Sequence, residues 1–267
     1  MKKTIKLALF LCLIALVSVL TLTACQGKDN PADNTQKTTT DRTISKETTP
    51  ATGSVGLAYT VNSDGATCTI TGIGTCTDAE IHIPKMIDGY KVTAIDHLAF
   101  SRCSNLTSIT IPDSVTTIGT EAFFGCSNLT SVTIPNSVTQ IYYGAFSCCS
   151  NLTSVTIPDS VLNLGAGVFQ SCEKLTSVTI GNSVPAIGMY SFYECSNLTS
   201  ITIPDSVTAI DLWTFRYCSN LTNIIFGGTI TQWNTISKGL DWNVYTGEYT
   251  IYCTDGTIAK DGTIVYN

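Results

Sequence analysis

The sequence repeats every 23 residues, and this period restricts the fold more than any other feature. Five copies run without insertion from Ile111 to Ile225, and a sixth, less regular copy precedes them from Ile83. One copy reads IPNSVTQIYYGAFSCCSNLTSVT, residues 134–156. A period of about 20 to 50 residues is typical of a solenoid, in which one repeat cannot bury its apolar face alone. Stacked copies bury each other's faces, so the repetition itself creates the core.

Each copy combines a strand pattern with a turn. Leu129, Val132 and Ile134 follow an L-x-x-V-x-I pattern. Its alternation predicts that Val132 and Ile134 point inward, with the Ser and Thr between them outward. Pro135 then turns the chain, and A-F-x-x-C at residues 145–149 predicts a short helical turn that closes the coil. The expected fold is therefore an α/β solenoid of coils about 23 residues long, with short parallel strands and short helical turns.

The pattern L-x-x-V-x-I-P-x-S-V-x-x-I with F-x-x-C-x-N-L closely resembles the BspA-like leucine-rich repeats of bacterial surface proteins. The resemblance covers the chain from about Tyr59 onward. It implies an N-terminal cap at residues 55–88, leucine-rich repeats at 89–226 and a C-terminal cap at 227–267. Such caps would cover end strands whose backbone edges are otherwise unpaired. The TDGT and KDGT sequences within the last segment predict hairpin turns.

The chain begins with a segment typical of an export signal. Basic residues precede an apolar run over residues 7–22, which is short for a permanent membrane span. The LTAC sequence that ends at Cys25 resembles the lipobox of bacterial lipoproteins, which implies cleavage before this cysteine and a lipid on its sulfur. We therefore expect a lipoprotein signal peptide at residues 1–24, with an ordinary signal peptide as the alternative.

Charge and composition change after the signal. Residues 25–54 are expected to be the lipidated cysteine followed by a disordered, Thr-rich tether, because they hold too few apolar residues to form a core. From Val55 onward the chain has 7 Lys and Arg against 16 Asp and Glu, a net charge of −9. Such a domain repels phosphate backbones, which argues against nucleic acid as a partner.

Six of the twelve cysteines fall at steps of 23 residues and so form one column: Cys103, Cys126, Cys149, Cys172, Cys195 and Cys218. Neighbouring strands lie about 4.8 Å apart, whereas the Cβ atoms of a disulfide prefer about 3.8 Å. We expect these thiols to be reduced and buried, with partial pairing or metal binding as alternatives. Cys68 with Cys76, or Cys148 outside the column, can also pair. No C-x-x-C pair supports zinc, so no metal or cofactor is expected.

Three polar columns accompany the apolar ones. Five N-L-T triplets match the N-glycosylation acceptor, but the lipobox favours asparagines that bond the neighbouring coil: Asn105, Asn128, Asn151, Asn197 and Asn220. A second column predicts turn capping, with a calcium site as the alternative: Asp113, Asn136, Asp159, Asn182 and Asp205. Outward Ser and Thr side chains tile the strand face, for solubility or, alternatively, for contact with ice or a polysaccharide.

Positions that differ between copies are free to specify a partner. The candidates for partner binding are Tyr142, Tyr143, Tyr190, Tyr193, Trp213, Arg216 and Tyr217. Tyr190 and Trp213 share one column, and Tyr193 and Arg216 share another three residues away, about one helical turn. This spacing predicts one patch on the convex flank. Exposed aromatic rings with an arginine are typical of interface hot spots. Packing of the rings on their own turns is the alternative.

The resemblance implies a protein that is exported, lipid-anchored to a bacterial membrane and exposed at the cell surface. Its expected function is adhesion to, or interaction with, proteins of host or neighbouring cells. Carbohydrate binding through the convex-face aromatics is the alternative, so the expected partner is an extracellular protein or glycan ligand. Catalysis has little support, because the two histidines, His82 and His97, lie in no nucleophile–base pattern. No catalytic residues are expected.

Overall fold

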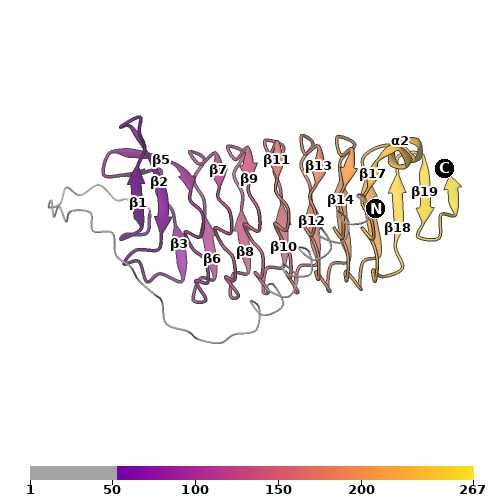
Figure 1. Ribbon diagram of the computed structural model, residues 1–267, viewed down its shortest axis with the longest axis horizontal. Coiled ribbons are helices and arrows are strands. Elements are labelled where there is room, and N and C mark those ends of the chain that lie inside the picture. Colours follow the sequence, from indigo (N-terminus) through magenta and orange to yellow (C-terminus); the bar gives the residue numbers. More distant parts are fainter. Residues whose placement is uncertain (1–52) are drawn as a thin grey trace, which may run out of the picture. The chain divides into compact units, whose positions relative to one another are not determined.

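The computed structural model describes residues 53–267, in which short strands of successive coils lie side by side along one axis (Figure 1). The expectations for the signal peptide at 1–24, for Cys25 and for the tether up to residue 52 lie outside the described residues. Within the described part, no helix has the length and apolarity to cross a membrane.

The L-x-x-V-x-I segments form a parallel ladder along one side of the coils, divided into two sheets between Thr133 and Ser154. Paired strands are displaced by one repeat, for example Val155 beside Val178. Val132 and Ile134 are buried, and the Ser and Thr around Val132 are exposed, so the predicted alternation is confirmed. The strands are β3 Glu80–His82, β6 Ser108–Thr110, β8 Ser131–Thr133, β10 Ser154–Thr156, β12 Ser177–Thr179, β14 Ser200–Ile203, β16 Asn223–Phe226 and β18 Thr250–Cys253.

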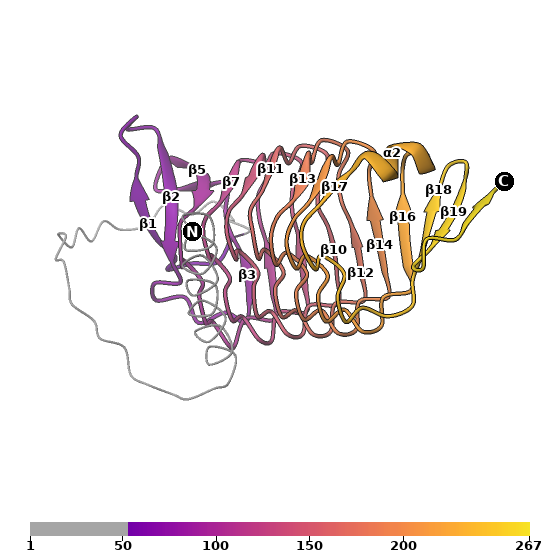
Figure 2. The same cartoon turned by 45° about the vertical axis from the view of Figure 1, so that its right-hand side comes forward.

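A second parallel ladder, also divided into two sheets, runs along another side of the coils, and the sequence analysis did not anticipate it. After β5, its strands are two residues long, and Ile118, Ile141 and Ile187 in them point into the core. The strands are β5 Tyr90–Ile95, β7 Thr117–Ile118, β9 Gln140–Ile141, β11 Asn163–Leu164, β13 Ala186–Ile187, β15 Ala209–Ile210 and β17 Ser237–Lys238. Figure 2 shows the two ladders as different sides of coils that follow one another.

The A-F-x-x-C segment forms consecutive β-turns, so the prediction of a short helical turn is wrong. In one coil the amides of Ala145, Ser147 and Cys149 each donate to the carbonyl oxygen three residues earlier. Amides between them donate to the next coil instead, as Gly144 N–H does to the Ala166 carbonyl oxygen at 2.9 Å. A helix directs its amides to its own segment, whereas this alternation joins neighbouring coils. We call this side of the molecule the turn ribbon; in the central coil it comprises residues 142–149.

The fold class is therefore corrected from α/β to a β-solenoid. Among the described residues the one helix is α2, Ile230–Thr235, which begins at a capping box between Thr229 and Gln232. It lies beside the last coils (Figure 1).

Antiparallel strands lie at both ends of the stack. They are β1 Ala58–Val61, β2 Thr67–Gly72 and β4 Met86–Ile87 at the first end, and β19 Gly256–Ala259 and β20 Ile264–Tyr266 at the other. β18, β19 and β20 pair as hairpins, and the TDGT and KDGT turns are confirmed. Because β17 and β18 continue the ladders, residues 227–267 include a further coil. The capping roles of 55–88 and 227–267 stay predictions.

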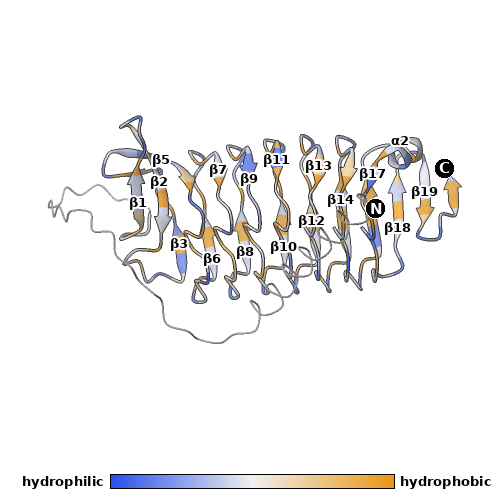
Figure 3. Ribbon diagram, viewed as in Figure 1, coloured by the Kyte–Doolittle hydropathy of each residue, from blue (hydrophilic) through white to orange (hydrophobic). Residues whose placement is uncertain are grey.

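The core consists of columns that pass through all coils, and apolar residues recur along the strands (Figure 3). Six phenylalanine rings stack with centroids 5.1 to 5.8 Å apart and planes within 8°: Phe100, Phe123, Phe146, Phe169, Phe192 and Phe215. The cysteine column lies beside them. Its members have free thiols, buried except for the half-buried Cys103, which confirms that expectation. Cys68 and Cys76 are also free.

Candidate functional site

A cluster of aromatic rings around an arginine lies on the turn ribbon in the last coils. We call it the aromatic patch, and it comprises Tyr190, Tyr193, Trp213, Arg216, Tyr217 and Tyr245. The sequence analysis predicted that the columns of Tyr190 and Tyr193 would meet, and the structure brings them together. They are neighbours because the Tyr193 amide closes a β-turn on the Tyr190 carbonyl oxygen at 3.1 Å, not because of a helix.

The rings of the patch contact each other in a chain. Tyr190 lies edge to face with Trp213, with ring centroids 5.3 Å apart, and with Tyr193 at 5.6 Å. Tyr193 meets Tyr217 in the same way at 5.5 Å. Tyr217 and Tyr245 are stacked at 5.0 Å with planes 5° apart. Edge-to-face and stacked pairs add attraction beyond the buried area, so the rings hold each other in place.

Arg216 lies among three of these rings. Its guanidinium carbon is 4.8 Å from the centroid of Trp213, 5.1 Å from Tyr217 and 5.5 Å from Tyr245. Its Nη2 donates a hydrogen bond to the Tyr217 hydroxyl at 3.3 Å. Burial by itself lowers the pKa of Arg216, but this hydrogen bond and the nearby tyrosines raise it overall. The side chain therefore carries a positive charge at every physiological pH.

The backbone of the patch has a conformation that usually requires glycine. Tyr190 and Trp213 have φ of 61° and 58°, at the ribbon position that Gly167 occupies in an earlier coil. Tyr217 and Tyr245 have φ of 66° and 60° at a second such position. A left-handed residue with a Cβ costs about 1–2 kcal/mol. Non-glycine residues of other coils, such as Leu98 and Glu194, have a positive φ at the same two positions, so this conformation is a property of the whole turn ribbon.

Part of the patch is open to solvent. Tyr245 is 61% exposed and Tyr217 is 36% exposed, whereas Tyr190, Tyr193 and Trp213 are half-buried. Burial raises the pKa of Tyr190 and of Tyr193 to about 12, so both hydroxyls stay neutral. The rings thus pack on each other, as the alternative in the sequence analysis proposed. Tyr217 and Tyr245 nevertheless remain exposed to solvent.

The remaining two candidates, Tyr142 and Tyr143, are 40% and 39% exposed and have different neighbours. The hydroxyl of Tyr143 is close enough to Tyr190 to raise its pKa, after the larger effect of burial. The Tyr143 ring lies over Gly167, whose absent Cβ would be 3.6 Å from ring atom Cε2. Tyr143 therefore extends the patch toward earlier coils. Tyr142 donates its hydroxyl to Gln140 Oε1 at 2.6 Å and contacts no ring of the patch.

The sequence analysis missed Tyr245. Strand pairing shows why: Ala209 pairs with Ser237, 28 residues later, whereas Ala186 pairs with Ala209 after 23. The five inserted residues shift the next coil, and Tyr245 takes the ribbon position of Tyr217 one coil further on. Alignment of the last coil with an insertion at α2 would have found it.

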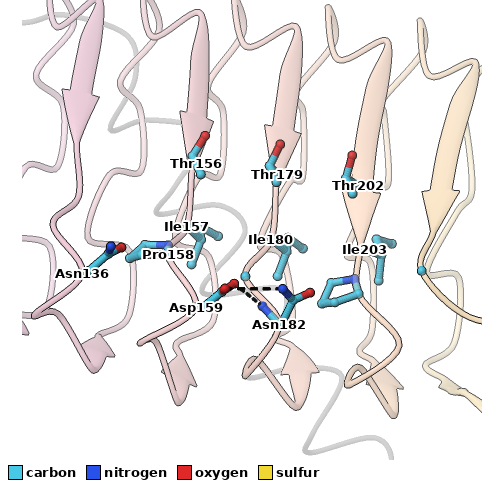
Figure 4. A pocket seen from close by; sticks show the side chains of 13 residues that line it. Asn136, Thr156, Ile157, Pro158, Asp159, Thr179, Ile180, Asn182, Thr202 and Ile203 are labelled. Carbon is cyan, nitrogen blue, oxygen red and sulfur yellow. Dashed lines mark hydrogen bonds between the residues drawn. The ribbon is translucent and has the colours of Figure 1, made fainter.

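A shallow groove of about 330 Å³ lies at the ends of strands β10, β12 and β14 (Figure 4). Thr156, Thr179 and Thr202 line it in a row. Beside them Asp159 Oδ1 accepts a hydrogen bond from the backbone amide of Asn182 at 2.7 Å. The lining contains hydroxyl, amide, aliphatic and carboxylate groups but neither an aromatic ring nor a cation. It therefore lacks the groups that give the aromatic patch its binding chemistry.

The polar columns have structural roles. The bond from Asn182 to Asp159 joins neighbouring coils, and the turn capping expected for this column stays a prediction. Among residues 53–267, no group of three or more His, Cys, Asp and Glu side chains is placed to hold a metal ion, which leaves the calcium alternative unsupported. Asn128 Nδ2 donates to the Ser104 carbonyl oxygen at 2.7 Å and Asn197 Nδ2 to that of Glu173 at 2.9 Å, as expected for contacts between coils.

The two histidines lie outside the patch. His82 Nδ1 is 3.1 Å from Thr110 Oγ1, and His97 Nδ1 is 3.2 Å from Asp96 Oδ1. Both side chains are exposed, and neither lines the groove. We assign no catalytic role to either histidine.

Comparison with known proteins identifies the repeat. The family described as BspA type Leucine rich repeat region (6 copies) matches residues 139–237. The solved T. pallidum Leucine Rich Repeat protein is 29% identical, with a TM-score of 0.66, over 75% of this chain and 89% of that one. A search of curated proteins found no match.

Two further solved structures are similar. A leucine rich cell surface protein from Faecalibacterium prausnitzii A2-165 is 29% identical with a TM-score of 0.63, over 82% of this chain and 61% of its own. A leucine-rich repeat protein from Bacteroides ovatus ATCC 8483 is 27% identical with a TM-score of 0.54, over 72% and 56%. The chain thus spans less than two thirds of these two proteins.

Proposed function

Since this is a leucine-rich repeat protein of the BspA type, we propose that it is a cell-surface interaction module that binds an extracellular protein of a host or neighbouring cell through the aromatic patch. The observation that carries the proposal is the set of mutually fixed rings around Arg216, two of them exposed. Tyr143 extends this surface, and Tyr142 lies outside it.

The composition of the patch suits a protein partner. Tryptophan, tyrosine and arginine dominate the hot spots of protein interfaces. Binding usually costs side-chain entropy, but the contacts of Tyr190, Tyr193 and Trp213 already restrict their rings in the free protein. These side chains therefore lose little further conformational entropy when a partner binds. Such a preformed surface binds more tightly than the same residues on flexible loops.

A glycan is the second candidate partner. It is favoured by Tyr245, whose ring is stacked on Tyr217 yet 61% exposed, because an open aromatic face can stack on a sugar ring. The protein partner remains the first choice because Trp213 and Arg216, residue types of protein interfaces, lie within the cluster. A sugar would find few open ring faces, because Tyr245 and Tyr217 are the exposed rings of the patch and they stack on each other.

The proposed location is outside a bacterial membrane, and the chain's first residues and one relative support it. A signal peptide and a lipid on Cys25 would place the solenoid outside a bacterial membrane. The similarity to a cell-surface leucine-rich repeat protein supports export. Labelled fatty acid should enter the full chain but not a Cys25→Ala variant. Equal labelling of both would contradict the anchor while leaving the aromatic patch untouched.

The function is tested by probing the full chain against extracellular-matrix proteins and, in parallel, a glycan array. The double variant Tyr190→Ala with Trp213→Ala should lose the signal that the natural chain gives. Tyr252→Ala and Tyr266→Ala are matched controls, because these tyrosines are 44% and 68% exposed outside the patch, and they should bind normally. Binding that survives the double variant would show that another surface is used. A signal confined to glycans would select the second candidate.

A further inference from the structure

We propose that the aromatic patch recognises a carboxylate, supplied by an Asp or Glu side chain of the protein partner, at Arg216. This inference rests on the proposed function, because it names the group on the partner that the patch selects. It follows from three features of Arg216: its charge has no acidic partner, its Nε donor lacks an acceptor, and the rings fix its position.

The first feature is the absence of an acidic partner. Among residues 53–267, Lys85 is paired with Asp113 at 2.8 Å and Lys260 with Glu248 at 3.2 Å, but Arg216 makes no salt bridge. Lys91, Arg102 and Lys174 also lack a salt bridge to any described residue but are exposed, and the half-buried Lys238 donates to the Trp233 carbonyl oxygen instead. Arg216 is half-buried, so water compensates its charge less than it does for an exposed side chain.

The second feature is an excess of hydrogen-bond donors. Arg216 Nε and Trp213 Nε1 are both buried and have no acceptor among the described residues. A nearby acid, Glu194, accepts instead from Ser171 Oγ at 3.1 Å. Buried donors normally have partners, and one that lacks them calls for an explanation. A ligand carboxylate offers up to about four acceptor sites and matches the guanidinium fork.

The third feature is the fixed position of the guanidinium. Trp213, Tyr217 and Tyr245 surround it at 4.8 to 5.5 Å, and the Tyr217 hydroxyl holds Nη2. A flexible arginine loses freedom when it binds, whereas this one is already held. Its half-buried position also lowers the effective dielectric constant around the guanidinium, which strengthens the attraction between the guanidinium and an anion.

The surrounding charge limits what can carry the carboxylate. The described domain has a net charge close to −9, so a strongly acidic segment or a polyanionic chain is repelled over distances of about 8–10 Å. One carboxylate on an otherwise neutral or basic protein surface avoids this repulsion. The partner class is therefore a protein with an isolated Asp or Glu amid uncharged residues.

The site itself can be probed without the partner. Benzoate supplies a carboxylate with a flat apolar body, and benzamide has the same shape without the charge. In NMR spectra of the full chain, benzoate should shift the Trp213 indole and Arg216 Nε–H signals, and benzamide should not. Arg216→Met should abolish the benzoate shift. Equal shifts with both probes, or shifts that persist in this variant, would overturn the carboxylate site.

A partner captured in the matrix-protein panel tests the source of the carboxylate. Arg216→Met should weaken its binding about tenfold or more, as expected when a charge pair at an interface is broken. Amidation of the partner's carboxyl groups should have the same effect. Arg102→Met is the matched control, since Arg102 also lies over a ring of the turn ribbon, Phe124 at 5.8 Å, but outside the patch.

The results separate this inference from the proposed function. If the double variant of Tyr190 and Trp213 loses the partner while Arg216→Met and partner amidation have no effect, the patch binds protein but recognises no carboxylate. If benzoate binds through Arg216 and no protein does, the carboxylate site stands and the protein-binding function fails. Binding only to carboxylated sugars on the glycan array would overturn the assignment to an Asp or Glu side chain.

Discussion

At the scale of single residues, the cysteine column shows how a polar atom is accommodated in an apolar core. Every column thiol after Cys103 donates to the carbonyl oxygen of a phenylalanine in the preceding coil, such as Cys126 Sγ to Phe100 at 3.0 Å and Cys149 Sγ to Phe123 at 3.2 Å. The sequence predicted reduced, buried thiols, because the column spacing is too wide for disulfides. It gave no indication of these hydrogen bonds, which depend on where the turns place the carbonyl groups.

The thiols predict a loss of stability at alkaline pH. Burial raises the pKa of Cys126 from 9.0 to about 12, and burial raises those of Cys149 and Cys172 well above 9.0. Below the unfolded-state pKa of 9.0 both states are protonated, and the contribution to stability is fully present. Above it the unfolded state ionises first, so the free energy of unfolding should fall as pH rises toward 12.

Urea unfolding at pH 7 and in steps above pH 9 measures this loss. Alkylation by iodoacetamide provides a readout specific to thiols, because buried tyrosines titrate in the same direction. The column thiols of the folded protein should react far more slowly than those of the chain in urea. Rapid alkylation of the folded protein at pH 8 would contradict their burial.

A second prediction at this scale concerns backbone strain at Trp213. Its φ of 58° is one that glycine adopts freely. Trp213→Gly should therefore be more stable than Trp213→Ala by about 0.5–1 kcal/mol, the reverse of the usual order in regular elements. Both variants should lose binding through the patch. Thermal unfolding of the pair measures the difference, and a more stable alanine variant would show that no strain is present.

At the scale of elements, the turn ribbon is the main point on which the sequence analysis was wrong. A-F-x-x-C places its apolar residues as one turn of helix would, so the pattern cannot distinguish a helix from linked β-turns. Gly125, Gly144 and Gly167 were the available signal, because glycine is unfavourable within a helix and suits a positive φ. The two-residue strands of the second ladder were too short to give an alternating pattern.

The phenylalanine stack predicts an effect that depends on position. Phe146 has a stacked ring on both sides, at 5.1 and 5.6 Å, whereas Phe100 has a stacked neighbour on one side, at 5.3 Å. Phe146→Ala should cost about 3–5 kcal/mol, and Phe100→Ala less by about one ring contact, roughly 0.5–1.5 kcal/mol. Urea unfolding compares them. Equal losses would mean that ring stacking adds nothing to burial.

At the scale of the whole molecule, repeated positions form the scaffold and the last coils carry the individual features. The 23-residue period was sufficient to predict stacked coils, the first ladder and the inward columns. It could not predict the full patch, because Tyr245 lies beyond the five-residue insertion that breaks the period. Long-range placement depends on how coils add along the chain, and one insertion shifts all that follows.

Removal of one complete coil tests this division. Deletion of residues 134–156 joins Thr133 to Ile157, which occupies the same repeat position as the removed Ile134. A shortened solenoid should fold with somewhat lower stability, and it should retain partner binding despite the loss of Tyr142 and Tyr143. Circular dichroism and thermal unfolding measure the fold. A deletion variant that cannot fold would contradict interchangeable coils.

Oxidative footprinting of the full chain with and without its captured partner tests the central claim, that the aromatic patch is the binding surface, most directly. Tyr217 and Tyr245 are 36% and 61% exposed, so they should be oxidised in the free protein and protected in the complex. Tyr252 and Tyr266, at 44% and 68%, should be oxidised equally in both. Protection of the latter pair with continued oxidation of Tyr217 and Tyr245 would contradict the account.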